Sequence, residues 1–326
     1  MARADLLVQL VRAGSRGDED TFRRLVADLA DEERRKQHHT LAERLLRSVE
    51  VRPTRGPRRV TDPTVQGLFT ERIPQRNLDE LVLPDSVVDT LDEIVEEQAR
   101  VELLRSHGLE PRHRLLLIGP PGTGKTSLAE ALANELSMSF VVPRYEALIG
   151  SLLGETAERV GRLFRVVAER PCVVFLDELD VLAKERSDTQ ETGEIKRVVS
   201  SLLLQIDALP SHVVVIGATN HPDLLDRAAW RRFQARLTLP MPSRALLIRY
   251  LERFQASAPV PWGYAPSTLA AKLLGLSFAE AEAFCLDVQR RVILEQPSGS
   301  AKSIVKKRLA MWADVAKAAS ESNLGG

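Results

Sequence analysis

A glycine-rich octapeptide, Gly-Pro-Pro-Gly-Thr-Gly-Lys-Thr, occupies residues 119–126 and lies between two contrasting patterns. The apolar run at residues 115–118 has the length and bulk of a strand that is buried on both faces. Residues 127–136 carry leucine and alanine at helical spacing and predict a helix that begins where the loop ends. In this order, loop N–H groups and the helix N-terminus point at phosphate oxygens. The sequence therefore predicts a nucleoside triphosphate site in an α/β fold with a parallel sheet.

The residues of this loop have separate predicted tasks. The glycines leave room for the backbone to curl around the phosphates. Lys125 is expected to reach the β- and γ-phosphates, and the Thr126 hydroxyl is expected to coordinate Mg²⁺. The predicted nucleotide-binding residues are Gly119, Pro120, Pro121, Gly122, Thr123, Gly124, Lys125, Thr126, Ser127 and Asp177.

A second buried-strand run, residues 172–176, ends in Asp177 and Glu178. The carboxyl ends of parallel strands meet at one edge of a sheet, where the phosphate loop also lies. Asp177 is therefore expected to join Thr126 in holding Mg²⁺, and Glu178 to polarise an attacking water. An acidic helix cap is the ordinary alternative for such a pair. Its position after a strand of a phosphate-loop protein favours catalysis, and a binding-only switch needs no such glutamate.

A third apolar run, residues 213–217, leads into Asn220, which is placed to hydrogen-bond the γ-phosphate and the water. An isolated asparagine at this point is more often a turn residue. Arg231 and Arg232 follow downstream, directly before Phe233. Paired arginines are usually a solvated surface, but their position after the asparagine strand indicates a second use.

Four ordered motifs carry a resemblance to a known family: GPPGTGKT, VVFLDE, VVVIGATN and LDRAAWRRFQARLTLPMP. Together they resemble an AAA-type ATPase of the AAA+ superfamily, a P-loop NTPase fold. The last motif is most similar to the branch of spastin, katanin and fidgetin. The resemblance covers roughly residues 78–295.

The resemblance implies a set of catalytic roles. Lys125 and Thr126 match the Walker A residues, Asp177 and Glu178 match Walker B, and Asn220 matches sensor 1. Arg231 and Arg232 match the arginine fingers, which in this family reach the γ-phosphate of the neighbouring subunit. Because such a site is completed by a second copy, the resemblance implies a homo-oligomeric ring, usually a hexamer. ATP and Mg²⁺ are the implied ligands.

The sequence departs from the family pattern at three points. Leu152 stands where many members have an aromatic pore-loop residue, and it is expected to grip an extended chain less strongly. Phe278 stands where the small domain of the family usually has glycine. A sensor 2 arginine is not evident near Phe278, which fits the AAA branch. These departures bear on threading of a polypeptide and leave the hydrolysis motifs intact.

The sequence also predicts helices outside the nucleotide motifs. Ser277 and Glu280 are expected to form a capping box that opens a helix to about Leu294, and a long helix is expected at residues 85–105. The last helix is expected at roughly residues 301–319. The chain is expected to have four parts: an N-terminal helical module (1–48), a basic Pro/Arg linker (49–75), an AAA+ large α/β domain (76–242) and a small helical lid domain with a C-terminal helix (243–326).

Composition favours a cytoplasmic protein. Lys+Arg and Asp+Glu both number 45, so no overall charge recruits nucleic acid. The two cysteines fit a reducing compartment, and no apolar run approaches the roughly 18 residues of a membrane span. His38 and His39 lack companion ligands, so Mg²⁺ is the only metal expected.

Two function classes remain open. The first is an ATP-driven ring that remodels, unfolds or activates a partner protein. The second is an ATP-controlled assembly switch or scaffold with little translocation, which Leu152 slightly favours. The segments beginning at Arg3 and Lys36 also resemble small bacterial AAA ATPases encoded beside subtilisin-like proteases, so such a protease is one candidate partner.

Overall fold

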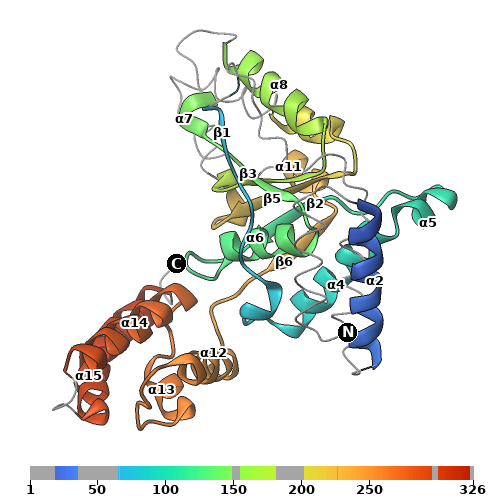
Figure 1. Cartoon of the computed structure of the whole chain (residues 1–326). Coiled ribbons are helices and arrows are strands. Elements are labelled where there is room, and N and C mark those ends of the chain that lie inside the picture. Colours follow the sequence, from blue (N-terminus) through green and yellow to red (C-terminus); the bar gives the residue numbers. More distant parts are fainter. Residues whose placement is uncertain are drawn as a thin grey trace, which may run out of the picture. The chain divides into compact units, whose positions relative to one another are not determined.

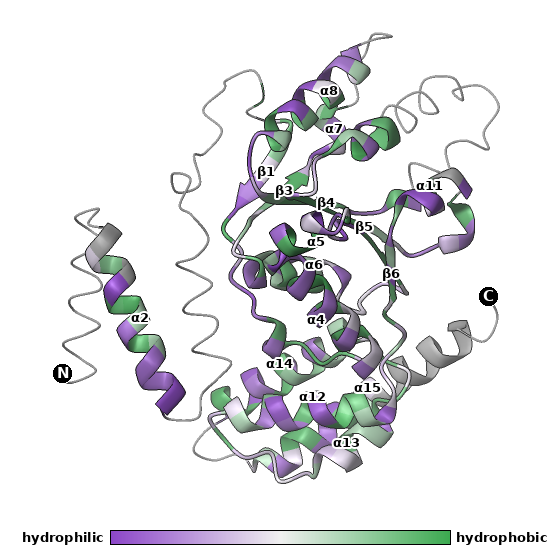
Figure 2. Cartoon of the chain, turned by 90° about the vertical axis from the view of Figure 1, so that its right-hand side faces the viewer, coloured by the Kyte–Doolittle hydropathy of each residue, from purple (hydrophilic) through white to green (hydrophobic). Residues whose placement is uncertain are grey.

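The computed structural model describes residues 19–35, 65, 67–148, 155–180, 202–225, 227–295 and 300–323; the side chains beyond 312 are not described. The chain divides into two units, residues 1–61 and 62–326. The described part of the first unit is helix α2 (Glu19–Arg35), whose polar and apolar residues alternate at helical spacing (Figure 2). The other predicted N-terminal helices, together with His38 and His39, lie outside the described residues.

The second unit contains a six-stranded sheet in the order β1-β3-β4-β5-β2-β6. All neighbouring strands are parallel except β1 and β3. Every residue of β4 and β5 is buried, which confirms the prediction of strands covered on both faces. Figure 1 shows helices on either side of this sheet. The strands are β1 (Phe69–Arg72), β2 (Arg114–Ile118), β3 (Ser139–Pro143), β4 (Cys172–Leu176), β5 (Val213–Thr219) and β6 (Ala235–Thr238).

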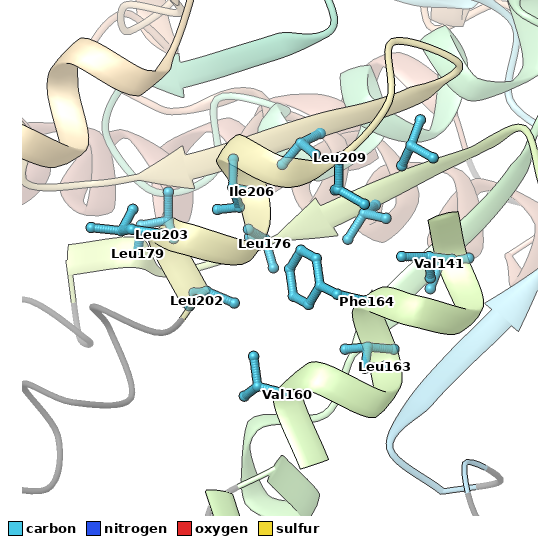
Figure 3. Packing of buried hydrophobic residues seen from close by; sticks show 14 of the residues in the cluster. Val141, Val160, Leu163, Phe164, Leu176, Leu179, Leu202, Leu203, Ile206 and Leu209 are labelled. Atoms are coloured by element: carbon cyan, nitrogen blue, oxygen red, sulfur yellow. The ribbon is translucent and has the colours of Figure 1, made fainter. Parts of the chain in front are cut away.

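Helices cover both faces of this sheet. One face packs against α8 and the helical residues 202–208, and Figure 3 shows the Phe164 ring between these two helical segments. The opposite face packs against α4 and α6. The helical segments of this part are η1 (Leu78–Glu80), α4 (Asp85–Ala99), α5 (Val101–Ser106), α6 (Lys125–Glu135), α7 (Tyr145–Leu148), α8 (Glu155–Ala168), η2 (Pro222–Leu224) and α11 (Arg227–Arg232).

Four further helices share a hydrophobic core of their own, with Trp262 and Phe284 at its centre. The predicted capping box is confirmed, because the Ser277 hydroxyl accepts the Glu280 N–H while the Glu280 carboxylate accepts the Ser277 N–H. The helices are α12 (Arg244–Ser257), α13 (Pro266–Lys272), α14 (Phe278–Leu294) and α15 (Ala301–Asn323).

Two local expectations need correction. Residues 69–72, which the sequence analysis assigned to the linker, form β1; the charged Glu71 and Arg72 conceal the strand. Glu71 pairs with Arg170 at 2.6 Å, and the Arg72 guanidinium lies over the Phe140 ring. The helix predicted for residues 85–105 is broken at Arg100, whose φ of −115° ends α4.

Phe278, which stands where the resembling family usually has glycine, needs none of the conformational freedom of glycine. Phe278 is the first residue of α14 and does not have a positive φ. Its ring lies 5.7 Å from the Tyr250 ring, so the larger side chain is accommodated by aromatic packing between α14 and α12.

The two cysteines are free and lie in different cores. Cys172 begins β4 and Cys285 lies in α14, and both are fully buried. Burial raises the pKa of the Cys172 thiol to about 12 and also raises the pKa of the Cys285 thiol. Among the described residues, no helix is long and apolar enough to cross a membrane.

Candidate functional site

The predicted phosphate loop joins β2 to α6, as the sequence analysis expected. Gly119 and Gly122 are required by close neighbours: a Cβ at Gly119 would lie 2.1 Å from the Leu239 carbonyl oxygen, and one at Gly122 would lie 2.6 Å from Ser277 Oγ. Gly124 has a φ of 94° immediately before α6 begins. Pro120 accepts a hydrogen bond from the Thr123 hydroxyl; Pro121 lies on the exposed side of the loop, and Ser127 lies in the first turn of α6.

Lys125 is the charged residue of this loop, and it is buried, with 7% of its surface exposed. Its ammonium group donates to the carbonyl oxygens of Gly119 (2.7 Å) and Pro120 (2.9 Å) and to Oδ1 of Asn220 (2.7 Å). These bonds use all three of its donors. Burial lowers the pKa of Lys125, and the nearby Asp177 and Asp180 carboxylates oppose that shift. The structure thus brings together the lysine of the phosphate loop and the asparagine that follows β5, which lie 95 residues apart in the sequence.

Asp177 follows β4 and contacts the start of α6. The Thr126 hydroxyl donates to Asp177 Oδ2 at 3.4 Å, and the Glu178 N–H donates to Asp177 Oδ1 at 3.0 Å. A hydroxyl and a carboxylate at this separation are the hard oxygen donors that Mg²⁺ prefers. The predicted pair of metal-binding residues therefore fits that ion.

Glu178 has an exposed side chain and an unusual backbone. Its φ of 49° is in the left-handed region, which side chains other than glycine rarely adopt. Such conformations occur where the surroundings hold them, often at functional sites. On the side opposite its N–H, the same peptide group is bound by Tyr145, whose hydroxyl donates to the Asp177 carbonyl oxygen at 2.9 Å.

Two residues of this site, Asp180 and Tyr145, were not predicted from the sequence. Asp180 is 5% exposed, and its Oδ1 accepts the Thr219 hydroxyl at 2.8 Å and the Asn220 N–H at 3.2 Å. Its place two residues after Glu178 was the available signal for Asp180. Tyr145 gave none, because its contact with Asp177 spans 32 residues of sequence.

The first turn of α14 also contacts the phosphate loop. The Ala279 N–H donates to the Gly122 carbonyl oxygen at 3.1 Å. The Ser277 hydroxyl and the Ala279 methyl group lie close to the space that a side chain at residue 122 would need. The helical domain therefore abuts the loop in which the nucleotide is predicted to bind.

Arg231 and Arg232 end α11 and differ in their surroundings. Arg232 Nε donates to Asp207 Oδ2 at 2.8 Å, and Asp207 also accepts from Arg114 at 3.0 Å. Arg231 is exposed and has no hydrogen bond or ion pair within the described part of the chain. Of the two, Arg231 is the more exposed. Leu152 lies in residues 149–154, outside the described residues.

Comparisons with known proteins agree with this geometry. The family model described as "ATPase family associated with various cellular activities (AAA)" matches residues 115–241. An uncharacterized AAA family ATPase, y4kL, of Sinorhizobium fredii is 37% identical over 304 residues, which cover 91% of each chain.

Two other relatives match over shorter regions. Proteasome-activating nucleotidase 2 of Haloferax volcanii is 37% identical over 191 residues, 56% of this chain and 46% of its own length. Peroxisomal ATPase pex6 of Schizosaccharomyces pombe is 39% identical over 170 residues, 50% of this chain and 18% of its own. The chain thus spans less than half of these two proteins.

Proposed function

Because this chain belongs to the AAA family of ATPases and hydrolyses ATP, we propose that it forms a ring that remodels, unfolds or activates a partner protein. The names of two relatives, a proteasome-activating nucleotidase and a peroxisomal ATPase, support this class of function. The observation that carries the proposal is that the Lys125 ammonium group donates to Asn220 next to Asp177 and Glu178. A group that can bind phosphate therefore lies beside a candidate general base.

In this proposal the phosphate loop binds ATP. Loop N–H groups and Lys125 hold the phosphates, so Lys125 exchanges its present carbonyl partners for phosphate oxygens. Thr126 and Asp177 hold Mg²⁺, Asp177 in part through water, and the ion supplies charge neutralisation.

Hydrolysis then needs a positioned water. Glu178 accepts a proton from the water while the water oxygen forms a bond to the γ-phosphorus. The bond between the γ-phosphorus and the β–γ bridging oxygen breaks, which yields ADP and phosphate. Asn220 releases Lys125 and directs its amide at the γ-phosphate and the water.

The ring is supported by the exposed end of α11. An arginine that reaches across a subunit interface must extend from its own chain, and the exposed Arg231 meets this condition. Arg232 stabilises α11 through Asp207, so we assign it a supporting role beside Arg231. Because the finger acts in the neighbouring site, hydrolysis depends on assembly, and a hexamer is the proposed stoichiometry.

The second candidate is an ATP-controlled assembly switch that regulates a separate partner, with little translocation. Leu152 favours it, because leucine offers less contact area to an extended polypeptide than an aromatic residue does. In both versions residues 1–48 serve as the docking module, and a subtilisin-like protease is the first partner to test. Trapping the ATP-bound ring and identifying the protein it retains distinguishes the partners.

The direct test of the site compares Lys125→Ala with Glu178→Gln. Lys125→Ala is expected to abolish ATP binding, because it removes the charge that holds the phosphates. Glu178→Gln is expected to retain binding and to stop turnover, because the amide keeps the shape of the side chain and loses its basicity. Binding of a fluorescent ATP analogue and phosphate release measure the two effects separately. Wild-type turnover in Glu178→Gln would refute the assigned role of Glu178.

A further inference from the structure

The peptide group between Asp177 and Glu178 is bound on both sides. Its carbonyl oxygen accepts the Tyr145 hydroxyl at 2.9 Å, and its N–H donates to the Asp177 carboxylate at 3.0 Å. A peptide group held by two hydrogen bonds cannot rotate without breaking at least one of them. The orientation of this peptide group determines the direction in which the Glu178 side chain extends from the backbone.

The backbone at Glu178 needs such a restraint. The φ of 49° costs free energy for a residue with a side chain and persists only where neighbouring contacts hold it. The Tyr145 hydroxyl supplies one of these contacts, because it donates to the Asp177 carbonyl oxygen.

Tyr145 is itself firmly placed. Its ring packs against the hydrophobic core that α8 forms on the sheet. The N–H of the preceding residue, Arg144, donates to the Leu68 carbonyl oxygen at 2.8 Å, and Arg159 of α8 donates to the Ala147 carbonyl oxygen at 3.1 Å. Because α7 is anchored to the segment before β1 and to α8, the hydroxyl has a fixed position against the turn that follows β4.

We propose that Tyr145 is a positioning residue for ATP hydrolysis, which holds the Asp177–Glu178 peptide so that the Glu178 carboxylate faces the attacking water. This inference rests on the role proposed for Glu178. It predicts a defect in turnover without a defect in ATP binding, because the Tyr145 hydroxyl contacts neither Lys125 nor the loop at residues 119–124.

The test uses Tyr145→Phe, which removes one oxygen atom and keeps the packed ring. We expect kcat to fall about 3- to 10-fold, the range for loss of one hydrogen bond. The KM for ATP, the affinity for a fluorescent ATP analogue and the midpoint of thermal unfolding are expected to stay close to wild type. Tyr264→Phe is the matched control, because Tyr264 is also partly buried but lies in the core of the helical domain.

Glu178→Gln and the double variant separate this inference from the function beneath it. If Tyr145 acts through Glu178, adding Tyr145→Phe to Glu178→Gln lowers the residual rate no further. An unchanged kcat in Tyr145→Phe, or losses that multiply in the double variant, would overturn the role of Tyr145 alone. A parallel loss of ATP affinity and thermal stability would show a merely structural contact. Wild-type turnover in Glu178→Gln would overturn both proposals.

Discussion

Asp180 holds two groups with one oxygen atom, and this determines what its replacement should do. Its Oδ1 accepts from the Thr219 hydroxyl and the Asn220 N–H in a buried position. Asp180→Ala leaves both donors without this partner and is expected to lower the free energy of unfolding by about 1–3 kcal/mol. It also frees Asn220 from its place beside Lys125, so turnover should fall. Urea unfolding and phosphate release measure the two losses.

Asp180→Asn is the matched control, because its amide keeps an acceptor oxygen in the same position. We expect it to retain more stability and turnover than Asp180→Ala. Equal losses in the two variants would mean that the negative charge matters and the acceptor geometry does not.

Helix α11 ends in two arginines that the sequence does not distinguish but whose surroundings in the structure differ. Several contacts around α11 fix its position: Arg232 pairs with Asp207, Arg236 lies over the Trp230 ring at 5.1 Å, and Trp230 donates to the Pro222 carbonyl oxygen. Arg231→Ala is therefore expected to leave folding and ATP binding unchanged and to cut turnover, by up to about 10³-fold. Arg232→Ala is expected to lower stability as well. Thermal unfolding, ATP binding and turnover distinguish them.

Two controls sharpen this comparison. Asp207→Asn removes the carboxylate charge that pairs with Arg232 and also with Arg114, so it should cost at least as much stability as Arg232→Ala if Arg232 acts within its own subunit. Mixing Arg231→Ala with Lys125→Ala protein should restore part of the activity, because some interfaces then join an intact loop to an intact arginine. Confirmed co-assembly without any recovery would contradict action across the interface.

The elements that the sequence predicted are those whose signals are local. The phosphate loop, the apolar strands and the capping box of Ser277 and Glu280 each occupy one short segment. The missed features depend on partners far apart in the chain: Tyr145 meets Asp177 across 32 residues, and Arg232 meets Asp207 across 25. Strand β1 was missed for another reason, since alternation of half-buried and exposed side chains over four residues does not distinguish a strand from a linker.

Considered as a whole, the second unit has one buried thiol on one face of its sheet and one in the core of its helical domain. Because the thiolate is the reactive form and both pKa values are raised, Cys172 and Cys285 should react with thiol reagents only when their own core opens. ATP at 100 times its dissociation constant is expected to slow labelling of Cys172 by about 100-fold. Cys285 should respond less, because among the described residues its domain contacts the nucleotide loop through the first turn of α14. Single-thiol variants, Cys172→Ala and Cys285→Ala, permit the comparison, and rapid labelling of either thiol in the folded protein would contradict it.

The burial of both native thiols has a practical consequence for single-molecule work. A cysteine introduced at an exposed position outside the nucleotide site, for example at Asp89 on α4 or at Lys306 on α15, would be the one site that a maleimide dye modifies in the folded state. Donor and acceptor dyes can then be attached to the sheet domain and to the helical domain without first replacing the native cysteines. The native chain is therefore suited to fluorescence measurements of how the sheet domain and the helical domain move during a cycle of ATP hydrolysis.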